Sequence, residues 1–164
     1  MSNLKIQDPI LRLREDHDRV LDVMDAIEQA VGELQGPVSP AALQLIRDAL
    51  AFMERDVRAH AQIEELVLYP AFLRHLPPLT IETLTEEHSD IWWAMDLLRE
   101  GLRDERQLRI AELRWHATSL VDLVRRHIER ESNVLLTIAA QLLSDPEYEA
   151  LVRAMHDFLL QRDR

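Results

Sequence analysis

His60-Ala61-Gln62-Ile63-Glu64 and His127-Ile128-Glu129-Arg130-Glu131 are the two stretches that decide the fold of this chain. In each, a histidine precedes a glutamate by four residues, so on an α-helix both side chains point the same way, about 5–6 Å apart at Cβ. Apolar residues recur at helical spacing around both pairs: Ile46, Leu50, Met53, Val57, Val67 and Ala71 around the first, and Leu113, Leu120, Val124, Val134, Ile138 and Leu142 around the second. Both pairs therefore lie on apolar helix faces, which normally face a core. A buried carboxylate is costly without a partner, so a positive charge is predicted between these helices.

Length and composition set the limits within which this core forms. The chain has 164 residues, which suits a single domain over residues 1–164. A formal net charge of −11 argues against nucleic acid or an anionic membrane as a partner. The absence of cysteine excludes disulfides, thiolate metal sites and thiol catalysis. The N-terminus has no apolar signal segment and no run reaches membrane-spanning length, so we expect a cytoplasmic protein.

Capping residues followed by proline mark the first two helices. Asp8-Pro9 predicts the start of a helix that Gly36-Pro37 ends, and Ser39-Pro40 begins a second helix that runs to about His75. Pro70 lies inside this second run, where it removes one backbone hydrogen bond and is predicted to kink the helix near its end.

Proline, glycine and charged residues divide the rest of the chain. Pro77-Pro78 forces a break, after which Thr80 is predicted to cap a third helix. Gly101 and the charged segment 103–106 mark the next turn, and a fourth helix is expected from about 107 to 143. Ser144-Asp145-Pro146 then begins a short fifth helix that ends near residue 162.

No stretch shows the alternation typical of a strand, so the fold class is all-α. Four amphipathic helices with short connections favour an antiparallel up-down four-helix bundle over about residues 10–143, with a short C-terminal fifth helix at about 146–162.

Each of the four long helices carries one histidine on its apolar face. These are His17, His60, His88 and His127. Estimated heights along the bundle agree to about one turn for His17 and the His60/Glu64 pair, but differ by up to about two turns for His88 and the His127/Glu131 pair. Four imidazoles and two carboxylates that converge in a bundle core make a ligand set for two metal ions, and iron, zinc and manganese all suit these donors.

A simpler interpretation is that these histidines are hydrogen-bonded core residues, as a single histidine on an apolar face usually is. One histidine on every helix, together with both carboxylates on apolar faces, favours the metal site instead. His75 and His116 lie too far along their helices to share it. His156, on the fifth helix, is expected at the surface or in packing.

The motifs resemble those of the hemerythrin-like (HHE cation-binding) domains over about residues 10–143. The most specific part runs from His60 through Glu64-Glu65 to Tyr69-Pro70, and Glu87-His88, His127 to Glu131 and Glu15-Asp16-His17 are similar to the family's other motifs. The resemblance implies a non-haem di-iron centre. One metal would take His17 and His60, the other His88 and His127, and Glu64 and Glu131 would bridge them.

Trp92 departs from the pattern of the family's oxygen carriers, which have a second histidine at this position, one turn after His88. The resemblance then implies a centre of four histidines and two glutamates with more open coordination positions. Reversible oxygen carriage is disfavoured, whereas turnover of oxygen or peroxide, or exchange of iron, is favoured. We expect Trp92 to line the metal pocket, although it could be an ordinary packing residue, and a register error of one residue would put Trp93 there.

Three functions follow as hypotheses. The first is a di-iron protein that senses or buffers iron, dioxygen or nitric oxide. The second is a redox enzyme, for example one that disproportionates peroxide, at the same ligands. The third is a bundle that binds zinc, or no metal, and serves as an interaction module. The sequence indicates no particular protein partner.

Overall fold

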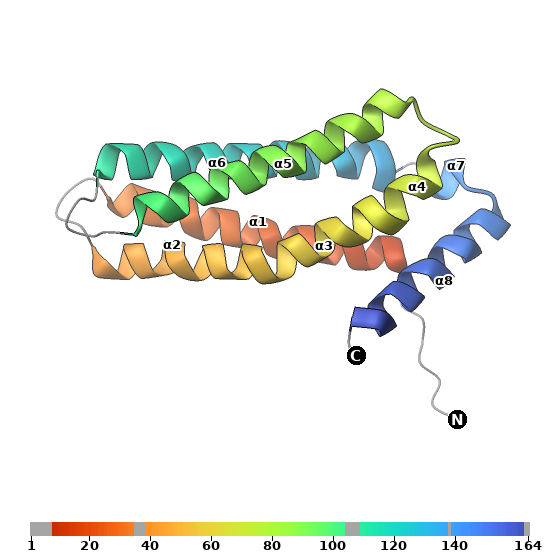
Figure 1. Ribbon diagram of the computed structural model, residues 1–164, viewed down its shortest axis with the longest axis horizontal. Helices are drawn as coiled ribbons and strands as arrows, with labels where there is room; N and C mark the ends of the chain where they lie inside the picture. Colours follow the sequence, from red (N-terminus) through yellow and green to blue (C-terminus); the bar gives the residue numbers. More distant parts are fainter. Residues whose placement is uncertain (1–7, 35–38, 104–108, 138, 163–164) are drawn as a thin grey trace.

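The structure is a computed structural model that describes residues 8–34, 39–103, 109–137 and 139–162. Four long helical runs lie side by side along the molecule, and consecutive runs point in opposite directions (Figure 1). The fold is therefore the all-α bundle with a C-terminal helix that the sequence predicts. The first run is α1 (Pro9–Glu33), and the second is α2 (Pro40–Phe52), η1 (Met53–Val57), α3 (Arg58–Ile63), η2 (Glu64–Leu68) and α4 (Tyr69–Phe72).

The second half of the chain completes the bundle and adds a helix across one end. The third run is α5 (Pro78–Gly101), and the fourth is α6 (Ile110–Glu131), η4 (Ser132–Leu136) and α7 (Ala139–Leu142). Helix α5 packs along α6, and α1 packs on both α2 and α6. Helix α8 (Asp145–Arg162) crosses the end of the bundle, against η2 and α1 (Figure 1).

The first two helices begin where their caps predict. The Asp8 side chain accepts hydrogen bonds from the backbone N–H groups of Ile10 and Leu11, and the Ser39 side chain accepts one from Ala42. A proline follows each cap at the first helical position, where its missing N–H is not needed. The break expected at Gly36-Pro37 lies outside the described residues.

The prediction that Thr80 caps the third helix is wrong. Helix α5 begins at Pro78, and the Thr80 N–H already donates to the Pro77 carbonyl at 2.9 Å. Pro78 itself starts the helix, because its ring fixes φ at a helical value and no N–H is left unsatisfied. The second run ends at Phe72 rather than near His75, and α6 begins at Ile110, beyond the undescribed residues 104–108.

Within the described residues, three short π-helical segments interrupt the second and fourth runs, a feature that the sequence reasoning did not predict. In each, a backbone N–H bonds to the carbonyl five residues earlier: Arg58 to Met53, Tyr69 to Glu64 and Thr137 to Ser132. The second run changes direction at α3, ahead of Pro70 (Figure 1). Single turns of π-helix are frequent at functional sites, and here two of them adjoin Glu64 and Glu131.

The core consists of two apolar clusters with a polar layer between them. One cluster joins α1, α2, α5 and α6 and includes Val20, Ile91 and Val124. The other joins the start of α1 to η2, α4, the start of α5, η4 and α8 and includes Leu13, Leu84 and Met155. Among the described helices, none is both long enough and apolar enough to cross a membrane.

Candidate metal centre

Six polar side chains occupy the layer between the apolar clusters. His17 comes from α1, His60 from α3, Glu64 from the start of η2, His88 from α5, and His127 and Glu131 from α6. All six are buried: His60 is the most exposed, at 7%, and both glutamates are at 0%. The bundle thus brings together every residue that the sequence proposed for the metal site.

Glu64 lies between two pairs of histidines. Its Oε1 is 2.5 Å from His60 Nε2 and 3.6 Å from His17 Nε2, while its Oε2 is 3.2 Å from His88 Nε2. The two oxygens of one carboxylate therefore face different histidine pairs.

Glu131 also reaches both pairs. Its Oε2 is 3.0 Å from His17 Nε2 and 4.0 Å from His127 Nε2. His88 and His127 approach each other to 3.1 Å between their Nε2 atoms, so the height difference expected between them is wrong. A later start of α6, at Ile110 instead of about residue 107, removes about one turn of that difference.

Two overlapping sets of side chains are arranged to hold a cation. In each set the candidate ligand atoms lie within 4.8 Å of one another. The first set is His17, His60, Glu64 and Glu131, and the second is Glu64, His88 and His127. Because Glu64 belongs to both sets, the two candidate positions are adjacent.

A second layer of polar groups fixes the outer face of each imidazole. His60 Nδ1 lies 3.1 Å from Asp16 Oδ2, His88 Nδ1 2.7 Å from Glu65 Oε1, His127 Nδ1 3.1 Å from Glu87 Oε2, and His17 Nδ1 3.2 Å from Ser132 Oγ. A carboxylate that accepts the Nδ1–H leaves Nε2 with a lone pair that points inward. Histidines that bind metals are oriented in this way, and the partner also raises the basicity of the ligand.

Sequence reasoning assigned no role to these outer partners, although a signal for three of them was present. Each acid is a direct neighbour of a core residue in the chain: Asp16 precedes His17, Glu65 follows Glu64, and Glu87 precedes His88. Each serves a histidine of another helix, which only the packing reveals. Ser132 carries no comparable signal.

Burial and mutual charge set the protonation of the cluster. Burial, followed by the charge of Glu64, raises the pKa of Glu131. Burial opposes the charged form of His17, but its contacts with Glu131 and Glu64 outweigh that effect and raise its pKa to about 8. Burial also opposes protonation of His60, whereas Glu64 and Asp16 raise its pKa to about 10. In the absence of a metal ion, the two buried carboxylates therefore favour the protonated form of the imidazoles beside them.

The unpaired atoms of the cluster fit a metal. Among the described residues, both oxygens of Glu64 and Glu131, His60 Nε2 and the Tyr69 hydroxyl are buried without a hydrogen bond. His60 Nε2 and Glu64 Oε1 are close, at 2.5 Å, yet they do not have hydrogen-bond geometry. Buried imidazole nitrogens and carboxylate oxygens that lack hydrogen bonds are a suitable donor set for a divalent transition metal.

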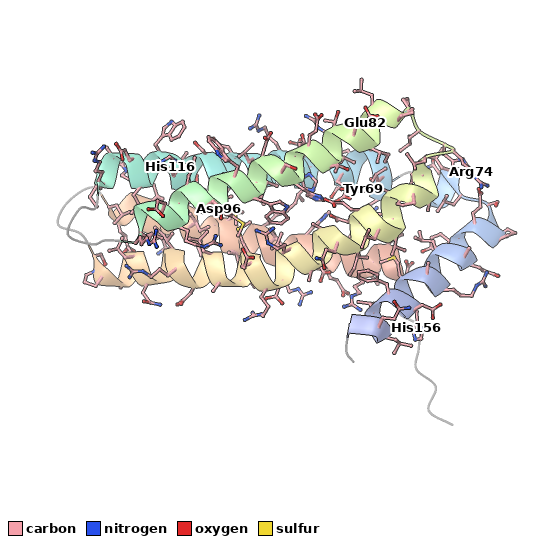
Figure 2. The ribbon with its side chains drawn as sticks, in the orientation of Figure 1. Tyr69, Arg74, Glu82, Asp96, His116 and His156 are labelled. Atoms are coloured by element: carbon pink, nitrogen blue, oxygen red, sulfur yellow. The ribbon has the colours of Figure 1, made fainter. Side chains whose placement is uncertain are left out.

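Two aromatic residues border the cluster. Tyr69 is 1% exposed and stacks on His88 with 6.0 Å between ring centroids, and Figure 2 shows it on α4 beside α5. Burial and the charges of Glu64 and Glu131 raise the pKa of its hydroxyl. Trp92 also stacks on His88, at 6.0 Å, and lines a cavity of about 20 Å³ together with all four histidines and Glu64. Trp93, by contrast, is 62% exposed.

The remaining histidines lie elsewhere. His75 Nε2 is 3.0 Å from Glu147 Oε1, which links the end of the second run to α8. His116 lies against Trp115. Figure 2 shows His116 near one end of the bundle and His156 near the end of α8, both away from the centre. Among the described residues, none of the three belongs to a set that could hold a metal.

A helical bundle with buried imidazoles and carboxylates on facing helices has the architecture of a metal-binding bundle protein. The family model for the hemerythrin HHE cation binding domain matches residues 8–139, which is most of the chain. The chain therefore belongs to the hemerythrin HHE cation-binding family. A comparison with curated proteins found no match. Helix α8 lies beyond the matched residues.

Proposed function

We propose that this protein is a non-haem di-iron protein that senses or reacts with a small ligand such as dioxygen, nitric oxide or peroxide. The observation that carries the proposal is the position of Glu64. Its Oε1 faces His60 and His17, whereas its Oε2 faces His88. A carboxylate placed between two histidine pairs suits two adjacent ions better than one.

The residues divide into two sets of ligands with shared carboxylates. His17 and His60 would hold one iron ion, His88 and His127 the other, and Glu64 and Glu131 would contact both. Asp16, Glu65, Glu87 and Ser132 contact the outer nitrogens of these histidines and would keep the inner nitrogens free to bind the ions. Bound iron would supply Lewis acidity and one-electron redox chemistry.

The size of the buried space supports a small ligand. The cavity that the four histidines and Glu64 line has a volume of about 20 Å³. A cavity needs roughly 10–15 Å³ to hold one water molecule, so the space at the cluster admits ions and ligands of very few atoms and nothing larger. Trp92 fills the position of the extra histidine in the family's oxygen carriers. Its bulk without a donor atom favours sensing or turnover over reversible carriage.

Metal content tests the proposal most directly. Protein purified without chelator should contain about two iron ions per chain by elemental analysis, with near-ultraviolet absorption from the ferric form. Zinc would give no such absorption, and a bundle that serves only as an interaction module would need no metal. A chain that loads zinc in preference to iron, or takes up no metal, would contradict the proposal.

A second candidate function, peroxide disproportionation, uses the same ligands. The observation in its favour is Trp92, which contributes no donor beside His88. Peroxide consumption by iron-loaded protein, with zinc-loaded protein as the control, separates this enzyme from a sensor. Sustained turnover of many equivalents supports the enzyme, and reaction with one equivalent supports the sensor.

A further inference from the structure

A second, larger cavity lies on the outer side of His60. Its volume is about 290 Å³, and it lies between α1 and the second helical run, with Leu159 of α8 on its wall. Val20, Val57 and His60 line both this cavity and the small one at the cluster. One layer of side chains therefore separates the two spaces.

The polar wall of the larger cavity carries one uncompensated positive charge. Of its three arginines, Arg19 pairs with Asp16, and Arg55 pairs with Asp56 at 2.6 Å. Arg12 is half-buried, and within the part of the chain that the structure describes its guanidinium has no ion pair or hydrogen bond. An arginine in this state presents its full set of N–H donors to whatever enters the cavity.

Part of the cavity wall is apolar. Val20, Phe52, Val57, Ile63 and Leu159 supply it. Ligand pockets usually measure about 300–1,000 Å³ and combine apolar walls with a few polar groups. A cavity at the lower end of that range suits a compact ligand with one charged end and a short apolar body.

We propose that this cavity binds a small aliphatic carboxylate, with the carboxylate on Arg12 and the hydrocarbon against the apolar wall. The planar guanidinium fork matches a carboxylate in two parallel hydrogen bonds. A single unpaired arginine balances one negative charge. Leu159 closes the site from α8, a helix beyond the region that the family model matches.

Calorimetric titration of the full chain with butyrate tests the site, and butyramide serves as the uncharged analogue of the same shape. Butyrate should bind at least about tenfold more tightly than butyramide, since a charge-assisted pair is lost in the amide. The affinity should be the same for protein as purified and for metal-free protein, because the site does not use the metals. Binding that requires the metals would place the anion on them and overturn the proposal.

Two variants identify the residues. Arg12→Met should weaken butyrate binding about tenfold, while Arg153→Met, which removes an exposed arginine of α8, should leave it unchanged. Leu159→Trp should fill the cavity and abolish binding in a chain whose helical circular dichroism is intact. Unchanged affinity in either Arg12→Met or Leu159→Trp, or the absence of butyrate binding in the unaltered chain, would overturn the proposal.

Discussion

The proposal of two metal ions depends first on the side chain of Glu64. Its two oxygens face different histidine pairs, and Glu131 also reaches both pairs. Because both carboxylates are fully buried, neither can turn to solvent for a partner. Each one is therefore stable in its ionised form only beside a cation or a protonated imidazole.

Replacement of either carboxylate tests this arrangement. Glu64→Gln or Glu131→Gln keeps the side-chain volume but replaces one donor oxygen with an amide NH₂ and removes the negative charge that both positions share. We expect the metal content, measured by elemental analysis, to fall from two ions per chain to one or fewer. His75→Ala and His156→Ala are the controls, since neither residue lies in the cluster. Near-full loading in both glutamine variants would refute the assignment of the bridging residues.

The outer partners of the histidines make a separate prediction. Asp16 accepts from His60 Nδ1 at 3.1 Å, so Asp16→Asn weakens the hold on that imidazole without altering the inner cluster. Loss of such a partner costs about 10–100-fold in metal affinity. Competition with a chromogenic chelator measures it, with Asp18→Asn, an exposed position on the same helix, as the matched control. Equal affinities in the two variants would show that the contact has no influence on binding.

A third prediction about single residues concerns Trp92. Trp92→His places a neutral donor one turn after His88, within reach by helix geometry. We expect tighter iron binding and slower reaction of the ferrous protein with oxygen or peroxide, because one open coordination position closes. Stopped-flow kinetics with iron counted in each sample measure the effect. Trp93→His is the control, since Trp93 is exposed. If both variants behave like the unaltered chain, Trp92 lies too far from the iron to act.

Among the elements, local signals predicted the starts of helices better than their internal geometry. Asp8-Pro9 and Ser39-Pro40 contain their cap chemistry within a few residues, so the sequence was sufficient to place α1 and α2. The π segment η2 begins at Glu64, and η4 begins directly after Glu131. The residues of these segments, Glu64–Leu68 and Ser132–Leu136, have no sequence propensity that predicts π-helical hydrogen bonding.

Helix α8 depends on a pH-sensitive cap at its start. Ser144 donates to Glu147 Oε2 through its backbone N–H at 2.9 Å and its hydroxyl at 2.7 Å, and His75 contacts Oε1. The Ser144 hydrogen bonds, followed by His75, lower the pKa of Glu147 to about 2. A lowered pKa means that the carboxylate stabilises the folded state above its unfolded pKa, and that this contribution disappears as the pH falls toward 2.

Glu147→Gln should therefore lower the melting temperature at pH 6, by an amount that shrinks below pH 4.5 and vanishes near pH 2. Thermal unfolding followed by circular dichroism at several pH values measures the difference. Glu149→Gln, on the exposed side of the same helix, should produce a smaller change at every pH. A melting difference that does not vary with pH would mean that the carboxylate charge has no part in the cap.

For the whole molecule, the position of the polar layer matters more than any one contact. The layer lies between two apolar clusters, so every helix of the bundle contributes a histidine to the place where solvent is excluded. The apolar periodicity of the sequence predicted that these histidines face the core, but not that His88 and His127 lie at the same height, which depends on how the helices pack. The larger cavity could not be predicted, because it depends on how α8 crosses α1 and the second run.

The stability of the whole bundle should therefore depend on its metals. Without them the core retains two buried carboxylates balanced only by protonated imidazoles, so the free energy of metal binding becomes part of the free energy of folding. A metal present at 100 times its dissociation constant adds about 2.7 kcal/mol, or roughly 5–11 °C in melting temperature for a chain of this size.

Chelation, or acidification that protonates the histidine ligands, should lower the melting temperature by at least this much, and added iron should restore it at neutral pH. Scanning calorimetry of matched loaded and metal-free samples, with the metal content verified in each, makes the comparison. Identical melting temperatures in the two samples would mean that the cluster is stable by its own proton sharing and that the six residues do not need a metal to form the core.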